Sequence, residues 1–493
     1  MMRSRAVSEW ITRELPGLVG KYGVPGAQVA VLVDGEVVDA AVGVLNTATG
    51  VPVTTDAVFQ IGSITKVWTA TLVQQLVNEG LLDLDRSLRE YLPEFRLADE
   101  AASAMVTSRQ LLCHTAGFEG DLFTDTGSND DAIEKYVATL ADVAQLFPPG
   151  EQFSYCNSGY VVLGRLVEVL RGKPFNTVLR ERLITPLALE HVATNIAEAI
   201  LERPAVGHVY VAPGCPVRPT PVWSLVASNA PVGSMLAMPA RSLLGFVQTH
   251  LSDTSVHMMR QPQVVLPDLV EGMRGSSGLG WMLFDYPGGT VIGHDGGTLG
   301  QSAFLRVVPE TGIAVALLTN GGDVFPVFHA VFGPLLAELA GVELPALPVP
   351  PANPLPVDAD RVSGTYRATM FDQKLSVDAE GKAWLSTVPR TAEAKLVMPQ
   401  ATVVEVVQLQ DDVLITAEPQ RGMHQVIGLL GEDPSGRVRF LHGNGRATAR
   451  VPAESGESGL ECGEHLGQLA GMHDAQALRR AGEGDVEVVE AAR

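Results

Sequence analysis

The sequence predicts an α/β domain followed by an antiparallel β-barrel, and three observations support this division. A β-rich run over residues 58–61 passes through Gly62 into a helical pattern. Six prolines crowd residues 345–356, a composition typical of a semi-rigid, extended linker. After the prolines the chain turns to short alternating apolar runs separated by turn signals, which indicate many short strands in an antiparallel barrel or sandwich. The predicted boundaries are 1–342 for the first domain, 343–357 for the linker, 358–453 for the β-domain and 454–493 for a mobile acidic tail.

The start of the helical pattern carries the first candidate chemistry. Ser63 and Lys66 are three residues apart, so they share one face if both lie in the first turn of a helix. A serine is a poor nucleophile without a nearby base, and a lysine whose positive charge is disfavoured by burial or by other cations can be that base. The alternative is a serine N-cap followed by a solvated lysine. The helix itself is supported by an apolar stripe at every fourth position: Ile64, Trp68, Leu72 and Leu76.

A second pair of candidate residues follows the turn-rich segment 147–154. Tyr155 and Asn157 lie two residues apart before a helical pattern, so both side chains can point into one cleft from a loop. The phenol can relay a proton, and the amide can hold both Lys66 and a substrate carbonyl. The alternative is an ordinary buried tyrosine followed by a helix-capping asparagine.

A glycine-rich segment, 293–297, is the third candidate element. It contains His294 and Asp295 and precedes the strand-like run 302–308. Glycines beside a β-edge allow a substrate to approach the backbone closely. The alternative for His294 is a structural histidine in a hairpin.

The order and spacing of Ser-x-x-Lys, Tyr-x-Asn and His-x-Gly resemble the serine β-lactamase and penicillin-binding-protein superfamily. Residues 109–117 resemble its "LLxHTSG" signature, and residues 79–85 resemble the segment after its nucleophile helix. The resemblance covers about residues 5–340. It implies a serine β-lactamase-like α/β (α+β) catalytic domain, in which an antiparallel sheet is flanked by helices and joined by an all-helical subdomain.

One departure from the family pattern concerns His294. Typical members carry Lys-Thr-Gly or Lys-Ser-Gly at this position, whereas histidine is usual in the esterase, D-aminopeptidase and peptide-cyclase branches. Histidine keeps a donor at the site but no permanent charge, which does not favour recognition of a β-lactam carboxylate. Antibiotic hydrolysis is therefore not the expected activity.

Composition limits the possible partners and the location of the protein. A net charge of −21 over 493 residues argues against a nucleic acid or an anionic membrane as partner. The N-terminal residues lack the long apolar run of a signal peptide, and no window predicts a membrane span. The four cysteines have no metal-ligand spacing and suit a reducing compartment. We expect a cytoplasmic protein that requires no metal and no organic cofactor.

The β-domain narrows the resemblance within the superfamily. Its opening, residues 362–367, resembles the lipocalin-like domain appended to some members. A catalytic domain of this type with such a C-terminal domain resembles the penicillin-binding-protein-type thioesterases, the surugamide-type cyclases of nonribosomal peptides. The resemblance implies that Ser63 takes a peptide from the thioester of a carrier protein and that the peptide's own amine releases it as a head-to-tail macrolactam. Members of this group generally prefer a D-residue at the acylating end.

The resemblance also implies a role for each site residue. Ser63 is the nucleophile, and Lys66 accepts its proton and passes it with Tyr155 to the leaving thiol. Asn157 positions Lys66 and the acyl chain, and His294 lines the opposite wall as a donor. The remaining implied roles are the oxyanion hole, formed by the backbone N–H groups of Ser63 and Gly297, and substrate binding, by Asp295, Gly296 and Arg446.

Three alternatives stay open at this point. A cytosolic esterase or D-amino-acid peptidase would form the same acyl-enzyme and release it with water, and the motifs do not encode that choice. A non-catalytic sensor that retains the fold is disfavoured by the intact Ser63, Lys66, Tyr155 and Asn157. Taken from the sequence alone, Arg446 is better explained as a solvated charge at a strand end, and only the family resemblance brings a substrate-binding role level with that explanation.

Overall fold

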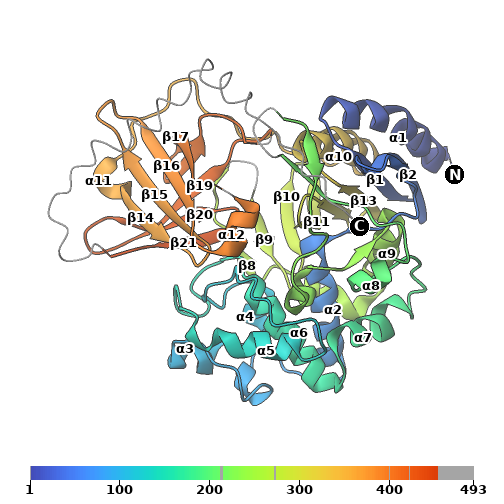
Figure 1. The fold of residues 1–493 in the computed structure, drawn as a ribbon, viewed down its shortest axis with the longest axis horizontal. Helices are drawn as coiled ribbons and strands as arrows, with labels where there is room; N and C mark the ends of the chain where they lie inside the picture. The colour runs from blue at the N-terminus through green and yellow to red at the C-terminus, as the bar shows by residue number, and fades with distance from the viewer. Residues whose placement is uncertain (1, 211–214, 271–273, 399, 421, 453–493) are drawn as a thin grey trace, which may run out of the picture. The chain divides into compact units, whose positions relative to one another are not determined.

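The computed structural model describes residues 2–210, 215–270, 274–398, 400–420 and 422–452. The predicted tail, 454–493, lies outside these residues. Within them, an antiparallel sheet flanked by helices precedes a closed antiparallel barrel (Figure 1), which confirms the predicted fold class. The predicted linker, 343–357, contains no helix or strand. The domain boundaries themselves stay a prediction.

A nine-stranded sheet forms the centre of the first domain, in the order β3-β2-β1-β13-β12-β11-β10-β9-β8. Each pair of neighbours is antiparallel. The strands are β1 (Gly26–Val33), β2 (Glu36–Asn46), β3 (Val51–Pro52), β8 (Val264–Val265), β9 (Gly275–Ser277), β10 (Met282–Tyr286), β11 (Gly289–Gly297), β12 (Ser302–Val308) and β13 (Ile313–Thr319). Strands β1 and β13 are buried along their whole length, as expected for apolar runs at the middle of a sheet that is covered on both faces.

Two hydrophobic cores cover the two faces of this sheet. On one face, α1 (Met2–Lys21) and α10 (Val324–Ala340) pack against alternate residues of β1, including Val29 and Val31. On the other face, α2 (Thr65–Asn78) and α9 (Ala240–Ser252) pack against Ala30 and Leu32. This alternation follows from the period of two along a strand. The sheet is therefore a rigid support between two helical layers.

The predicted all-helical part lies between the short strand β4 (Phe59–Gln60) and β5 (His208–Tyr210). Figure 1 shows α3 to α6 grouped away from α1 and α10. The helices that follow α2 are α3 (Glu100–Met105), α4 (Ser108–Leu112), α5 (Ala132–Ala138), α6 (Asn157–Arg171), α7 (Phe175–Leu179) and α8 (Ile196–Ala199). Two short strands complete the domain: β6 (Val217–Pro219), which pairs with β5, and β7 (Ala237–Met238), which pairs with β4.

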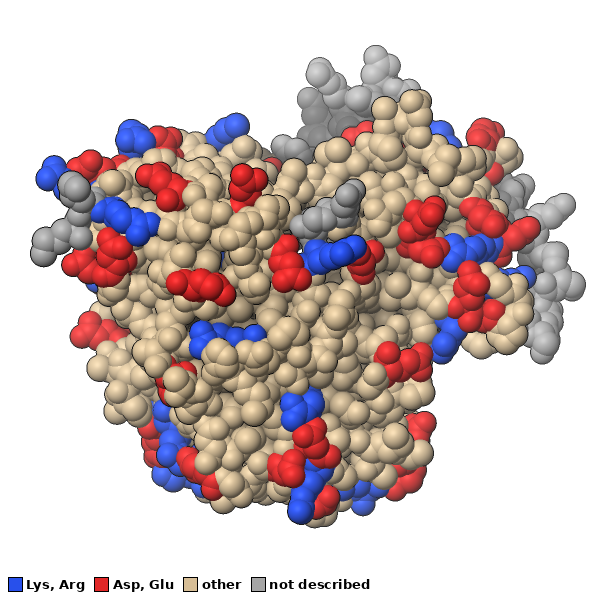
Figure 2. All heavy atoms as spheres, turned by 180° about the vertical axis from the view of Figure 1, so that it is seen from behind, with Lys and Arg blue, Asp and Glu red and all other residues tan. Residues whose placement is uncertain are grey.

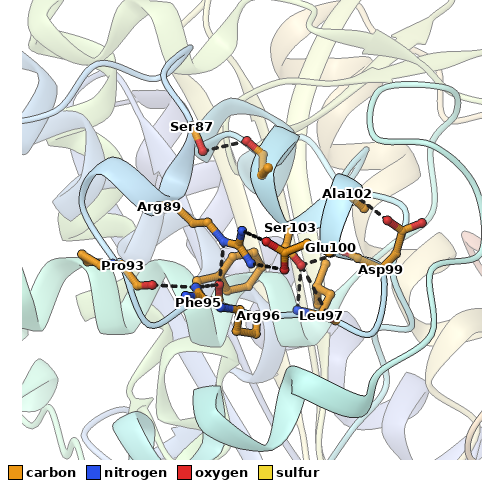
Figure 3. A network of polar contacts seen from close by, with 11 residues as sticks. Ser87, Arg89, Pro93, Phe95, Arg96, Leu97, Asp99, Glu100, Ala102 and Ser103 are labelled. Carbon is orange, nitrogen blue, oxygen red and sulfur yellow. Dashed lines mark hydrogen bonds and ion pairs between the residues drawn. The ribbon is translucent and has the colours of Figure 1, made fainter.

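The segment before α4 is held by side chains more than by regular structure (Figure 3). Arg89 donates to the Phe95 carbonyl at 3.0 Å and forms an ion pair with Glu100. The Ser103 hydroxyl accepts from the Leu97 N–H at 2.8 Å, and Asp99 caps the start of α3. These contacts fix the connection between α2 and α4, and α4 leads directly into a loop of the candidate site.

The C-terminal part is a closed antiparallel barrel in which β14 pairs with β21. Its core contains Tyr366, Leu375, Val406, Ile427 and Leu441. The strands are β14 (Gly364–Arg367), β15 (Phe371–Val377), β16 (Ala383–Pro389), β17 (Thr402–Gln410), β18 (Val413–Thr416), β19 (Val426–Glu432), β20 (Val438–Gly443) and β21 (Arg446–Arg450). Two short helices accompany them, α11 (Ala359–Val362) and α12 (Ala392–Val397). The alternating runs of the sequence thus close into one sheet.

Charged side chains are distributed over the surface without a dominant patch on the face drawn in Figure 2. Acidic and basic groups are interspersed there. Many form exposed ion pairs, such as Arg5 with Glu9 and Arg274 with Asp268. In the described residues no helix is both long and apolar enough to cross a lipid bilayer.

Candidate active site

The nucleophile turn connects β4 to α2. Ser63 lies in a short 3₁₀ turn, Gly62–Ile64, and Lys66 lies in the first turn of α2. The Lys66 Nζ and Ser63 Oγ atoms are 3.0 Å apart, and Nζ also donates to the Val232 carbonyl at 3.2 Å. The residue before α2 is Ile64, and no side chain caps the helix. The alternative of a serine N-cap with a solvated lysine is therefore wrong.

Burial determines the charge of Lys66. The apolar stripe of α2 is buried in the core, and it carries Lys66 to complete burial as well. Burial first, and the positive charge of Arg446 second, hold the pKa of Lys66 well below its usual range. The Nζ atom also lies 4.8 Å from the centre of the Tyr155 ring. Lys66 therefore has the geometry of a base for Ser63, and the direction of its pKa shift favours the neutral form that a base requires.

Tyr155 lies in the loop before α6, where one aromatic ring and one guanidinium contact its ring. The His114 ring stacks on it with centroids 4.3 Å apart, and the Arg446 guanidinium lies 4.7 Å from its centre. Burial raises the pKa of the Tyr155 phenol well above its usual range, and its hydroxyl is buried without a hydrogen-bond partner among the described residues. The phenol therefore stays protonated near pH 7. His114 belongs to the segment that resembles the "LLxHTSG" signature, but the sequence analysis assigned it no role in the site; its Nδ1 accepts from the Cys156 N–H at 3.0 Å.

Asn157 is the first residue of α6, and its partner is an acidic residue that the sequence analysis also missed. Asn157 Nδ2 donates to Asp121 Oδ1 at 2.6 Å. The hydrogen bonds of Lys66 go to Ser63 and Val232, so the expected contact between Asn157 and Lys66 is not among the hydrogen bonds of the described residues. Asn157 lines the same cleft as Ser63.

Arg446 reaches this site from the barrel. It is the first residue of β21, and its Nε donates to Asp121 Oδ2 at 2.6 Å. The backbone joins the two domains at the same point, because the Tyr155 N–H donates to the Gly445 carbonyl at 2.8 Å. The Ala447 N–H donates to the Ser154 hydroxyl at 3.1 Å. The reading of Arg446 as a solvated charge at a strand end is therefore wrong.

His294 lies on β11 and is buried, with one ring nitrogen engaged. Its Nδ1 lies 2.7 Å from the Asp295 carbonyl oxygen, which only accepts, so Nδ1 carries the hydrogen. Burial lowers the pKa of His294 to about 4, and nearby Lys66 contributes to this shift, so the ring is neutral near pH 7. The remaining nitrogen, Nε2, is buried without a hydrogen-bond partner among the described residues. The expected donor role of His294 is thereby corrected, because this tautomer offers the cleft an acceptor.

The Asp295 carboxylate is bound by a residue of the neighbouring strand. Arg306 of β12 donates to both of its oxygens, at 2.6 and 3.1 Å. The Arg306 side chain is 5% exposed and Asp295 46%, and the guanidinium lies 4.5 Å from the centre of the Phe284 ring. Asp295 lines the cleft, but its charge is already compensated by this pair.

Glycines bring β11 into contact with the nucleophile turn. A Cβ built on Gly62 would lie 2.6 Å from the Gly297 nitrogen, and one built on Gly296 would lie 3.1 Å from the Ser63 nitrogen. On the other side of the turn, a Cβ on Gly233 would lie 1.9 Å from the Gly62 carbonyl oxygen. The backbone N–H groups of Ser63 and Gly297 are thus close neighbours, as an oxyanion hole requires.

These groups open into one cleft of about 940 Å³ that both domains line. Its apolar wall includes Phe123, Leu225, Leu269, Met282 and Phe284. The barrel contributes residues from two of its loops and the strands beside them: Met423, His424, Gln425, Val426, His442, Asn444, Gly445 and Arg446. The cleft is also lined by residues that the sequence predicted for the site: Ser63, Tyr155, Asn157, His294, Asp295, Gly296, Gly297 and Arg446. In the described part of the chain, no group of three or more histidine, cysteine, aspartate or glutamate side chains is arranged to hold a metal.

Comparison with known proteins identifies the family. The Beta-lactamase family model matches residues 11–330. A relative from Amycolatopsis lactamdurans, named Penicillin-binding protein 4, is 44% identical over 359 residues, which cover 70% of this chain and 94% of the relative. The D-amino acid amidase of Ochrobactrum anthropi SV3, at 23% identity and a TM-score of 0.55, covers 65% of this chain and 92% of its own, a likeness that shows the fold alone.

One solved structure matches almost the whole chain. The crystal structure of SurE aligns with a TM-score of 0.71 at 30% identity and covers 91% of this chain and 99% of its own. A structure of SurE with D-Leu covers 90% of this chain and 100% of its own. An alignment that covers 91% of this chain is much longer than residues 11–330, the part that the family model matches, so the likeness to SurE includes the barrel. The protein therefore belongs to the β-lactamase and penicillin-binding-protein superfamily of serine hydrolases.

Proposed function

We propose that the protein is a trans-acting peptide cyclase: it takes a peptidyl group from a carrier-protein thioester onto Ser63 and releases it as a head-to-tail macrolactam. The observation that carries this proposal is the cleft of about 940 Å³, which contains Ser63 and is walled by the barrel as well as by the first domain. That volume is at the upper end of the range of about 300–1,000 Å³ for ligand pockets. It suits a folded peptide better than a single amino acid.

Acylation would use the geometry around Lys66. Neutral Lys66 Nζ, 3.0 Å from Ser63 Oγ, removes the hydroxyl proton as Oγ attacks the thioester carbonyl. The carbonyl oxygen becomes an oxyanion between the N–H groups of Ser63 and Gly297. The new C–O bond stays as the C–S bond breaks. The thiolate takes a proton from the Tyr155 phenol, which Lys66 then reprotonates, so Lys66 and Tyr155 return to their starting states.

Release would use the free amine of the same peptide. The amine attacks the Ser63 ester, a C–N bond forms, and the C–O bond to Oγ breaks. The proton that the amine loses is taken up by Lys66 and returned to Oγ. Well-oriented intramolecular reactions reach effective molarities of about 10⁵–10⁸ M, so a tethered amine can outcompete water. The buried Nε2 of His294 offers this amine an acceptor on the cleft wall.

The match to SurE over both domains supports this proposal, and the structure of SurE with D-Leu is in keeping with a D-residue at the acylating end. The preferred substrate in the proposal is accordingly a peptidyl thioester that ends in a D-residue, carried by a nonribosomal peptide synthetase. The proposal places the enzyme in the cytoplasm, where such a carrier protein would be found.

A second candidate is hydrolysis of the same acyl-enzyme. It is favoured by the 44% identity to the protein named Penicillin-binding protein 4. In this case water takes the place of the amine, and the substrates are simple esters or amides of D-amino acids. The chemistry up to the acyl-enzyme is identical in the two candidates, so only the released product separates them.

The test is incubation with matched linear peptidyl thioesters that end in a D- or an L-residue, followed by mass analysis of the products. The proposal predicts mainly cyclic peptide from the D-ended substrate and little turnover of the L-ended one. Ser63→Ala is the control and should give no enzymatic product. If linear acid dominates with every D-ended thioester while D-aminoacyl amides turn over rapidly, the protein is a hydrolase.

A further inference from the structure

One carboxylate, Asp121, connects the barrel to the catalytic residues. It lies in the loop between α4 and α5, and its two oxygens accept from Asn157 at 2.6 Å and from Arg446 at 2.6 Å. A second bond from Arg446 Nη2 is 3.4 Å long. We infer that Asp121 is a positioning residue that fixes Arg446 and Asn157 for acyl transfer to Ser63. This inference rests on the acylation half of the proposed function and does not depend on how the acyl-enzyme is released.

The bond to Asp121 orients the Asn157 amide. An asparagine side chain has an N–H₂ donor and a carbonyl acceptor at opposite corners. Because Nδ2 donates to Asp121, the carbonyl oxygen Oδ1 is the atom left for a ligand at this wall of the cleft. An acceptor at this place can receive an N–H group of the peptide backbone. Without Asp121 the amide could turn, and donor and acceptor would exchange places.

The same carboxylate fixes the Arg446 side chain. Arginine loses much rotamer freedom when it is held, so its position needs several contacts. Nε and Nη2 donate to Asp121, and Nη1 donates to the Asn444 carbonyl at 2.7 Å. In this position the guanidinium lies over the Tyr155 ring. The Arg446 side chain is 36% exposed, so it is held in place while part of it still faces the cleft.

The seam between the domains does not depend on Asp121 alone. The backbone bonds from Tyr155 to Gly445 and from Ala447 to Ser154 join the same two loops. Phe147 of the first domain also packs edge-on against Phe440 of the barrel. A change at Asp121 therefore removes a side-chain link while the barrel stays attached. This makes the residue suitable for a test of positioning.

Asp121 and Arg446 also act on Lys66 with opposite signs. Arg446 lowers the pKa of Lys66, whereas Asp121 raises it. The other titratable groups around Lys66 are uncharged near pH 7: burial lowers the pKa of His114 and His294 and raises that of Tyr155, Tyr160 and Cys156. Burial and the nearby Asp121 raise the pKa of Glu119 to about 7, and Glu119 in turn contributes to the raised pKa of Cys156. The balance at Lys66 is thus set mainly by one carboxylate and one guanidinium.

The experiment compares wild type with Asp121→Asn, Arg446→Ala and the double variant. The readout is the rate of thiol release from a peptidyl thioester as a function of pH. Thiol release is the same whether the product is cyclic or linear. The amide introduced by Asp121→Asn would still accept a hydrogen bond from Asn157, so this substitution isolates the link to Arg446. Asp121→Ala removes both links and should be slower still.

We expect Asp121→Asn to lower kcat/KM for thiol release by about ten- to a hundredfold, as for loss of a charge-assisted hydrogen bond. In the Arg446→Ala background the same substitution should cost less than about threefold, because the partner is already gone. The acid limb of the pH profile should move to lower pH in Asp121→Asn and to higher pH in Arg446→Ala, since catalysis needs neutral Lys66. A merely structural role would not produce opposite shifts.

Two results would overturn the inference: an equal cost of Asp121→Asn in both backgrounds, or shifts of the acid limb in the same direction. A wild-type protein that releases no thiol from any peptidyl thioester would instead refute the proposed function. If Asp121→Asn does not fold by circular dichroism, Arg446→Lys replaces it. Lysine keeps the positive charge but lacks the planar guanidinium that donates to both carboxylate oxygens. For Arg446→Lys we therefore expect an acid limb at the same pH as in wild type and a rate of thiol release as low as that of Arg446→Ala. A wild-type rate in Arg446→Lys would contradict the positioning role.

Discussion

Replacement of Gly296 by alanine is a sharp test of how β11 supports the nucleophile turn. A Cβ at this position would lie 1.9 Å from the Ile61 carbonyl oxygen, whereas ordinary van der Waals contact begins near 3.4 Å. Strand and turn must therefore separate by about 1.5 Å, the difference between these distances. Because the oxyanion donors come one from each element, the separation misplaces them. A misplacement of about 1 Å can cost on the order of 100-fold in rate, and overpacking of a buried site typically costs about 1–3 kcal/mol of stability.

The adjacent glycine provides a matched control. A Cβ on Gly297 meets no atom within 4 Å, and alanine keeps the backbone N–H. The assay is the second-order rate of Ser63 labelling by a fluorophosphonate, measured with the melting temperature of each variant. We expect Gly296→Ala to label at least about 100-fold more slowly and Gly297→Ala to stay within a few-fold of wild type. Equal labelling rates for the two variants, with both folded, would contradict the expected clash between a Cβ at position 296 and the Ile61 carbonyl oxygen.

Three further predictions concern individual side chains. Ser63→Ala should abolish labelling and thiol release while the melting temperature is unchanged, and substantial turnover by the folded variant would contradict a Ser63 nucleophile. The rate of wild-type labelling should rise with pH through a midpoint well below the usual lysine pKa of 10.5, because burial lowers the pKa of Lys66. Lys66→Ala should label about 10²–10⁴-fold more slowly and should lose this rise with pH. A wild-type midpoint near 10 would argue against a neutral Lys66. The pKa of Glu119 is about 7 in the folded protein against a usual 4.5, so its contribution to stability is lost as pH rises from about 4.5 to 7. Glu119→Gln should therefore stabilise the protein by on the order of 2 kcal/mol at pH 8 and by less near pH 5. Urea unfolding of the two proteins that shows no such pH dependence would contradict this pKa.

The parts of the site that the sequence predicted are those that local spacing determines. Ser63 and Lys66 are three residues apart at the start of a helix whose apolar stripe is visible in the sequence, so their proximity follows from local spacing, whereas the complete burial of Lys66 depends on the tertiary structure. The alternating runs of the β-domain predicted an antiparallel barrel or sandwich, because each strand keeps the period of two, and the resemblance of residues 362–367 to a lipocalin-like domain indicated the barrel that the structure shows. The place of Arg446 came from the family resemblance, since its own neighbours in the sequence give no indication of a site.

The residues that were missed depend on contacts between distant segments. Asp121 lies in a loop without a helical or strand pattern, and its partner Arg446 is 325 residues away. The tautomer of His294 depends on the path of β11 at Asp295, which no spacing rule gives. Arg306 could have been noticed, because it is the one charged residue in the apolar run 302–308 and a buried guanidinium requires an acidic partner. That partner is Asp295 on the adjacent strand.

In the proposed reaction, a peptide held on Ser63 is released by its own amine. The most direct measurement is single-turnover mass spectrometry of the protein mixed with a D-ended peptidyl thioester, in which intact protein and small-molecule products are recorded over time. We expect a peptidyl adduct to appear on the protein at Ser63 and to decay at the rate at which a product one water lighter than the linear acid forms. An adduct that decays only to the linear acid, or cyclic product that forms equally fast with Ser63→Ala, would contradict the proposed reaction.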